Sequence, residues 1–281
     1  MKRVGKRKLF SDMKKLVYLL MSLSFVAFAS CEDKENSSSE SRTGIENGYE
    51  WVDLGLPSGT LWATCNVGAS KPYEYGNNYA WGEVTTKETY DWSTYKYGSD
   101  YDQLTKYCSK ASFGKDGFTD NKTILDPEDD AAYVNWGGKW RMPTNEQMYE
   151  LGHECYWEWT ANYNGTNVAG FIVYKFKNEK EKMNWMIGKL PSRTLSDPHI
   201  FLPASPCVSI YGELHYADIY WSSTLVEQYP ECAYYIYINS SAKSDGIGLD
   251  EPDDHVLCWV SRYENSRCDG YRVRAVIPGK K

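Results

Sequence analysis

An apolar run from Leu16 to Ala29 marks the first thirty residues as distinct from the rest of the chain, which can build a core. The basic residues before this run are Lys2, Arg3, Lys6, Arg7, Lys8, Lys14 and Lys15. The run is too short to span a bilayer comfortably, but a basic segment followed by a short apolar one is typical of a secretory signal. We therefore expect residues 1–30 to be removed. A start at Met13 would also give a complete signal, so both starts remain open.

The signal ends in a pattern that predicts lipid attachment. Ala29 and Ser30 lead directly into Cys31, which resembles the lipobox of bacterial lipoproteins, although Phe28 stands where Leu, Val or Ile is usual. Several acyl chains on one cysteine hold a protein to a membrane more firmly than a single chain does. We expect cleavage before Cys31 and a membrane anchor on its thiol. The alternative is an ordinary secretory signal that is cut nearby.

The residues after Cys31 are polar and charged, so we expect residues 31–47 to form a solvated tether. The acidic cluster at residues 32–35 resembles the export signal of surface lipoproteins in Bacteroides-type bacteria. That resemblance implies an outer-membrane lipoprotein exposed at the cell surface.

Charge excludes some classes of partner. Without residues 1–30 the chain keeps 24 basic and 37 acidic side chains, a net charge of −13. Such a surface repels nucleic acid and anionic lipid, and no basic stripe is expected to offset it. We therefore expect no nucleic-acid partner.

Beyond the tether, the sequence favours short strands, long loops and one main helix. Runs rich in aromatic and β-branched residues predict strands at 49–54, 61–64, 171–176, 200–202, 219–222, 233–238 and 271–276. Thr144 can cap a helix that begins near Asn145, with Met148 and Leu151 on one face. Residues 66–130 are expected to be loop-rich. The prediction is a single α+β domain over residues 48–281.

Several blocks resemble the Fibrobacter succinogenes major paralogous domain, which is common in surface lipoproteins of gut Bacteroidetes and has no established activity. They occur in the family's order: YEWVDLGLPSGTLWATCNVG (49–68), DDAA (129–132), NWGGKWRMPT (135–144), FLPA (201–204), YWSS (220–223) and YRVRAV (271–276). The block from Trp140 to Glu146 also resembles C-type-lectin-like and formylglycine-generating-type domains. The resemblance implies a single C-type-lectin-like domain. The reactive cysteine pair of formylglycine enzymes has no counterpart, so oxidase chemistry is not implied.

The cysteines and histidines give little support to a zinc site. Seven cysteines follow Cys31, none with CxxC spacing, and the four histidines are far apart in the sequence. Export permits disulfides, and an odd number leaves at least one thiol free or bonded to another chain. Cys258 and Cys268, which flank a predicted hairpin, are the favoured pair.

Two polar features could bind a ligand, and each also has a structural interpretation. The guanidinium of Arg141 could grip a carboxylate, or it could tie the helix start to the last strand through Glu146 or Asp129. The acidic segment with Asp126, Glu128, Asp129 and Asp130 could supply oxygen ligands to calcium, the one cofactor that the sequence suggests. Acidic runs are more often solvated surface. Glu251-Pro252-Asp253 resembles a lectin sugar triplet, but its expected partner motif is absent.

Aromatic side chains suggest sugar binding, because apolar sugar faces pack on rings whose rims form hydrogen bonds. The candidates for exposed rings in loops are Trp81, Tyr90, Trp92, Tyr95 and Tyr97, with Trp157 and Trp159 near the helix end. Core packing is the alternative for most of them. No nucleophile, metalloprotease, phosphate-loop or dinucleotide motif is present. We therefore expect a non-catalytic protein that binds an extracellular glycan or a host surface; the alternatives are a component of a surface assembly or fimbria and, third, an envelope hydrolase.

Overall fold

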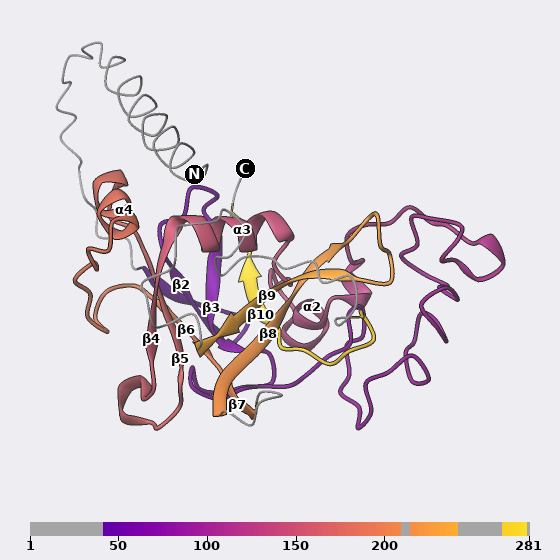
Figure 1. The fold of residues 1–281 in the computed structure, drawn as a ribbon, viewed down its shortest axis with the longest axis horizontal. Helices are drawn as coiled ribbons and strands as arrows, with labels where there is room; N and C mark the ends of the chain where they lie inside the picture. Colours follow the sequence, from indigo (N-terminus) through magenta and orange to yellow (C-terminus); the bar gives the residue numbers. More distant parts are fainter. Residues whose placement is uncertain (1–41, 209–213, 241–265, 280–281) are drawn as a thin grey trace, which may run out of the picture. The chain divides into compact units, whose positions relative to one another are not determined.

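The computed structural model describes residues 42–208, 214–240 and 266–279 (Figure 1). Residues Ser41–Lys281 form one compact unit. Its described part combines three antiparallel sheets with three α-helices, which confirms the α+β class. Among these residues no helix has both the length and the hydropathy needed to cross a membrane.

The first sheet joins the two ends of the domain. Its strands are ordered β1 (Thr43–Glu46), β2 (Tyr49–Asp53), β3 (Leu61–Asn66) and β10 (Arg274–Ile277). Strand β1 lies inside the segment that we expected to be tether, so ordered structure begins before Gly48. The reason is the turn at Asn47 and Gly48, whose φ angles are 49° and 86° and which closes a hairpin with β2.

The other two sheets are built from the middle of the chain. One is β4 (Cys155–Thr160), β5 (Gly170–Lys175) and β6 (Ile200–Pro203); the other is β7 (Ser205–Val208), β8 (Leu214–Leu225) and β9 (Ala233–Asn239). The predicted strands at 171–176, 200–202, 219–222 and 233–238 therefore correspond to observed strands. Strand β4 was not predicted, because its aromatic run continues directly from a helix.

The helices are α2 (Ala131–Trp136), α3 (Asn145–Glu154) and α4 (Glu179–Met186). The prediction for α3 is confirmed: Thr144 Oγ1 accepts from the Gln147 amide at 3.3 Å, and Gln147 Oε1 accepts from the Thr144 amide at 2.9 Å. This reciprocal capping satisfies two backbone donors that the helix leaves free. Met148 and Leu151 are buried as expected.

Tryptophan and tyrosine supply the largest side chains of the core. The fully buried indoles are Trp62, Trp81, Trp140 and Trp221. Trp81 Nε1 donates to the Ser222 carbonyl at 2.8 Å and Trp221 Nε1 donates to the Tyr79 carbonyl at 2.9 Å. Because the indole nitrogens of Trp81 and Trp221 have acceptors, these two rings can be buried without a large desolvation cost, whereas Trp62 Nε1 has no hydrogen-bond partner among the described residues.

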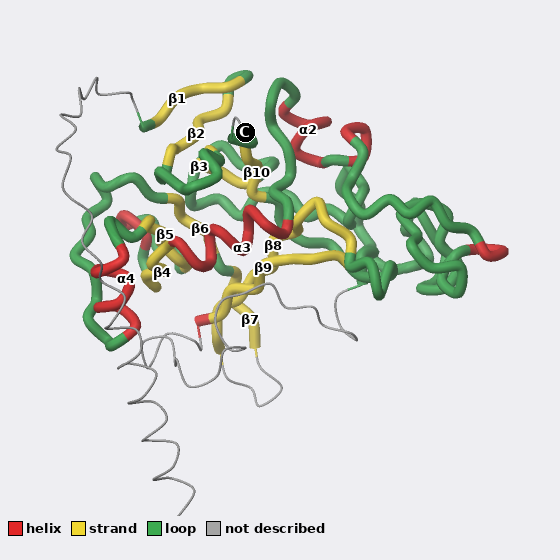
Figure 2. Tube along the Cα trace, turned by 90° about the horizontal axis from the view of Figure 1, so that it is seen from above, coloured by secondary structure: helices red, strands yellow, loops and turns green. Residues whose placement is uncertain are grey.

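The long segment between β3 and α2 contains loops and only two short 3₁₀ helices, η1 (Lys115–Gly117) and η2 (Pro127–Asp129). A further one, η3 (Tyr163–Gly165), connects β4 to β5. Figure 2 shows the long segment as coil at one end of the unit, with α4 at the other end. The expected loop-rich region is therefore present.

Candidate functional site

The described surface contains a cleft of about 690 Å³ beside β2 and β3, here called the Tyr49 cleft. Its lining residues are Gly48, Tyr49, Glu50, Thr64, Cys65, Gly68, Ala69, Ser70, Lys71, Pro72, Glu74 and Trp136. The cleft therefore combines polar groups with the half-buried ring of Tyr49, whereas the lining residue Trp136 is itself buried.

The aromatic part of the Tyr49 cleft is held rigidly. The Tyr49 ring stacks on Trp136 with centroids 4.0 Å apart, and Trp136 packs edge-on against Trp140 at 5.1 Å. The side chain of Asn47 donates to the Trp136 carbonyl and so connects the hairpin turn to α2. Tyr49 is half-buried, so part of its ring remains accessible in the cleft.

The polar part is a turn organised by Glu74. Its carboxylate accepts from the Ser70 amide at 2.7 Å and from the Lys71 amide at 3.2 Å. These backbone hydrogen bonds, with Ser70 first, hold the pKa of Glu74 below its ordinary value. Glu50, on the strand opposite, is exposed and free to meet a ligand.

A second cleft adjoins the Tyr49 cleft, and a third adjoins the second. The His199 cleft, about 420 Å³, shares Glu50, Thr64 and Pro72 with the Tyr49 cleft. The Arg193 cleft, about 370 Å³, shares Arg42, Asp197 and Pro198 with the His199 cleft, so the three follow one another across the surface.

Inside the His199 cleft an imidazole is fixed by its neighbours. His199 Nε2 lies 2.9 Å from Tyr163 Oη, and His199 Nδ1 lies 2.8 Å from the Asp197 carbonyl. The Tyr163 ring stacks on Phe201 with centroids 4.0 Å apart. Because Tyr163 and Phe201 are buried, the cleft offers mainly polar groups, with the His199 ring held in place by Tyr163 and the Asp197 carbonyl.

The carboxyl groups of the three clefts do not resemble a hydrolytic pair. A general acid needs a carboxyl with a raised pKa. Burial raises the pKa of Asp130, Asp218, Glu231 and Asp269, but none of these lines the three clefts of the described surface. In the clefts, hydrogen bonds lower the pKa of Glu74 and Asp197. These three clefts therefore do not pair a carboxyl of raised pKa with one of lowered pKa.

A cysteine also lines the Tyr49 cleft. Cys65 is half-buried, and burial raises its pKa above the ordinary value for a thiol. A thiol with a raised pKa carries little thiolate and is a poor nucleophile. Cys268 has a buried free thiol, and its expected disulfide partner Cys258 lies outside the described residues, as does the triplet 251–253.

The structure corrects the expectation of exposed, ligand-binding rings at Trp81, Tyr95 and Tyr97, and in part at Trp92. Trp81, Tyr95 and Tyr97 are buried in the core, where Tyr95 Oη donates to the Trp81 carbonyl at 2.7 Å. Trp92 is half-buried and packs edge-on against Tyr95 at 5.5 Å. None of the four lines the three clefts, because the loop folds its rings inward around one another.

The other aromatic candidates also pack against neighbouring side chains. Tyr90 is half-buried against the core and donates to the Asn78 carbonyl at 2.7 Å. Trp157 and Trp159 lie on β4 and pack edge-on against Phe171 at 6.1 and 5.1 Å.

Arg141 has a structural role, but its contacts differ from the expected ones. Its backbone exchanges two hydrogen bonds with Val276 of β10, at 2.9 and 2.8 Å, and so ties the start of α3 to the last strand. Its guanidinium lies over the Tyr133 ring at 4.1 Å and donates to the Trp140 carbonyl at 2.6 Å. Neither Glu146 nor Asp129 is needed for this connection.

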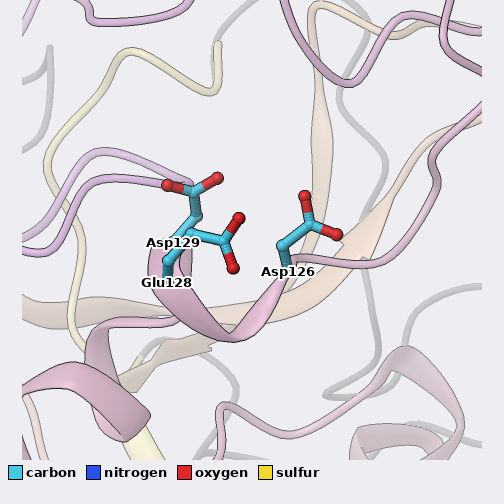
Figure 3. Close-up of side chains that lie close together, drawn as sticks. All are labelled: Asp126, Glu128 and Asp129. Atoms are coloured by element: carbon cyan, nitrogen blue, oxygen red, sulfur yellow. The ribbon is translucent and has the colours of Figure 1, made fainter.

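The acidic segment forms a cluster, but lysines neutralise it. Asp126, Glu128 and Asp129 bring carboxylate oxygens within 4.8 Å of one another on one turn (Figure 3). Lys106 Nζ lies 2.8, 3.7 and 2.5 Å from the three in that order, and Lys122 Nζ lies 2.6 Å from Asp126. A calcium ion would have to displace the Lys106 ammonium, so the residues present do not favour one.

The fourth acidic residue has a separate role. Asp130 is buried and caps α2, accepting from the Ala132 and Tyr133 amides at 2.9 and 3.0 Å. It also accepts from the Met142 amide at 2.9 Å. With its oxygens committed to backbone donors, Asp130 connects α2 to the segment before α3 and lies outside the acidic cluster.

Neither a protein-family model, nor a curated protein, nor a solved structure matches the chain. The site therefore has to be interpreted from its own geometry. Sequence reasoning missed its principal residues, Tyr49, Glu50 and Trp136. All three lie in strand or helix patterns that predict packing, and only the hairpin and α2 together bring them to one surface.

Proposed function

We propose that the chain is a lipid-anchored outer-membrane protein of the major paralogous domain family, exposed at the cell surface. The signal-like segment before Cys31 and the acidic residues after it support the anchor and its location. The ordered sequence blocks and the α+β architecture around α3 support a C-type-lectin-like domain. Its function is non-catalytic binding of an extracellular glycan.

The observation that carries this proposal is the run of three adjoining clefts that begins at Tyr49. An oligosaccharide is an extended chain with polar rims and apolar faces, so it needs a shallow groove with rings and hydrogen-bonding groups in alternation. The Tyr49 and His199 clefts provide the hydrogen-bonding groups and one partly exposed aromatic ring, Tyr49, with Glu50 at their shared boundary.

The test is a glycan-array screen of the chain from residue 31, with Cys31→Ser to prevent lipidation. We expect reproducible binding that falls about ten-fold, or about 1.4 kcal/mol, in Tyr49→Ala and in Glu50→Ala. Because Glu50 is exposed, its variant separates lost binding from lost folding. Tyr101→Ala, an exposed ring outside the three clefts, serves as the matched control.

The same screen tests calcium dependence. Since Lys106 already neutralises the acidic cluster, binding is expected to be unchanged by a chelator. Absence of binding to any glycan, with and without calcium, would contradict the proposed function.

Strand β1 supports a second candidate function, in surface assembly. It is the edge strand of the first sheet, and its Ile45 is 74% exposed. Edge strands can pair with another chain. If β1 serves assembly, Ile45→Lys should abolish oligomers detected by sedimentation and leave glycan binding intact.

A further inference from the structure

The segment around α4 leaves five large apolar side chains exposed on the described surface. Met183 is 64% exposed, Ile187 70% and Leu190 68%. The whole set, here called the α4 surface, is Met183, Met186, Ile187, Leu190 and Leu195. Several large exposed apolar side chains close together in the chain point to an interaction site more strongly than an isolated one does.

The α4 surface belongs to an ordered element. Trp185, on the same helix, packs against Phe176 at 5.4 Å and edge-on against Tyr156 at 6.5 Å. Lys182 Nζ lies 3.0 Å from Glu154 at the end of α3. The inner side of α4 is thus fixed to β4 and β5, which leaves its apolar outer side facing solvent.

Positive charge surrounds these apolar groups. Residues 175–193 contain six basic and two acidic side chains, although the chain as a whole is acidic. One acid, Glu181, is paired with Arg193 at 2.5 Å, whereas Lys177, Lys180 and Lys189 are exposed. The expectation that no basic cluster would offset the acidic surface is therefore wrong in this segment.

We propose that the α4 surface docks on an anionic lipid bilayer. Interfacial binding needs an apolar group that enters the headgroup region together with lysine or arginine that meets the lipid phosphates. The α4 surface supplies the first and Lys177, Lys180 and Lys189 the second. An acidic soluble protein partner would match the charge but would not need five apolar groups beside it.

The position of the chain before Arg42 supports a membrane as the occupant. Arg42, the first described residue, lines the Arg193 cleft, and Arg193 is bound to Glu181 of α4. Only residues 32–41 separate Arg42 from the proposed anchor at Cys31, a reach of at most about 40 Å. In its cellular setting the inference rests on the proposed anchor, which would keep the α4 surface near headgroups.

The test is vesicle flotation with the unlipidated chain from residue 31, carrying Cys31→Ser. The vesicles are phosphatidylcholine alone or phosphatidylcholine with about one third phosphatidylglycerol. We expect binding to the anionic vesicles at least about ten-fold tighter than to the neutral ones, weakened by about 0.5 M salt. Because no lipid anchor is present and no glycan is added, the result is independent of the glycan proposal.

The variants test whether vesicle binding depends on the α4 surface or on exposed apolar side chains in general. Ile187→Glu with Leu190→Glu is expected to reduce vesicle binding at least ten-fold, whereas Val134→Glu, at an exposed apolar position on α2, leaves it unchanged. No binding to anionic vesicles, or equal loss in the control, overturns the proposal. So does a wild-type dimer that the double variant converts to monomer, because a second copy would then cover the surface.

Discussion

At the scale of single residues, two buried arginines hold distant segments together. Arg274 donates to Asn66 Oδ1 at 2.8 Å and to the Ala63, Thr64 and Phe201 carbonyls at 2.7 to 3.0 Å. Arg267 donates to the Lys106 and Tyr107 carbonyls of the long loop segment at 2.7 and 2.8 Å, and to the Pro230 carbonyl at 3.0 Å. Each guanidinium has five N–H donors, so it can donate to several backbone carbonyls at once.

Removing either arginine should destabilise the protein strongly, because buried carbonyls would lose their donors. We expect Arg274→Ala and Arg267→Ala each to lower the free energy of unfolding by about 3 kcal/mol. Urea denaturation measures this change, with exposed Arg42→Ala expected to stay within about 0.5 kcal/mol. An Arg274→Ala variant as stable as the wild type would show that these contacts are dispensable.

The lysine-neutralised cluster predicts a pH dependence of stability. Hydrogen bonds from Lys106 and then Lys122 lower the pKa of Asp126 from 3.8 to about 2. As the pH falls, the unfolded chain takes up this proton first, so the stabilisation is full above about pH 4 and is lost towards pH 2. Asp126→Asn should therefore flatten the profile of unfolding free energy against pH over this window. A variant with the wild-type slope would rule out this ion pair as the cause.

At the scale of elements, local sequence signals predicted helices and strands well, whereas elements that depend on long-range pairing were missed. The capping of α3 and the strands β5, β6 and β9 follow from short patterns of a cap or an aromatic run. Strand β1 was missed because it has only one large apolar residue, Ile45, and its stability comes from the Asn47-Gly48 turn and from pairing with β2. Helix α4 was missed because apolar residues lie on its solvent-facing side. Its sequence therefore lacks the regular spacing of apolar residues that marks an amphipathic helix.

The cap of α3 gives a direct test at this scale. Thr144→Ala should lower the free energy of unfolding by about 1 kcal/mol, since the Gln147 amide loses its acceptor. Thr144→Ser keeps the hydroxyl and should remain within a few tenths of a kcal/mol. Thermal or urea unfolding distinguishes the two variants; equal losses in both would point to packing of the threonine methyl group instead.

At the scale of the whole molecule, the α+β class could be predicted but the site could not. Aromatic residues in loops predicted exposed rings, yet Trp81, Tyr95 and Tyr97 pack on one another in the core. The Tyr49 cleft requires a hairpin, a strand and α2 to meet, which no local pattern encodes. The acidic cluster was found from sequence, but the lysines that pair with it, which include Lys96 as well as Lys106, lie as many as 33 positions away.

The proposed anchor makes a separate whole-molecule prediction. In cells fed an alkyne-labelled fatty acid, the wild-type protein should incorporate the label and fractionate with membranes. Cys31→Ser should lose the label, and the pool of protein outside the membrane should rise. A label that persists in Cys31→Ser would show that the lipid is attached to another residue, and would contradict the prediction.

The most direct measurement of the central claim is calorimetric titration of the unlipidated chain with array-positive oligosaccharides of increasing length. Because the Tyr49 and His199 clefts adjoin, affinity should rise with each added sugar until both are filled. Tyr49→Ala should weaken the longest ligand about ten-fold. A monosaccharide that binds as tightly as the longer chains, or a ligand whose affinity is unchanged in Tyr49→Ala and Glu50→Ala, would contradict a glycan-binding groove at this site.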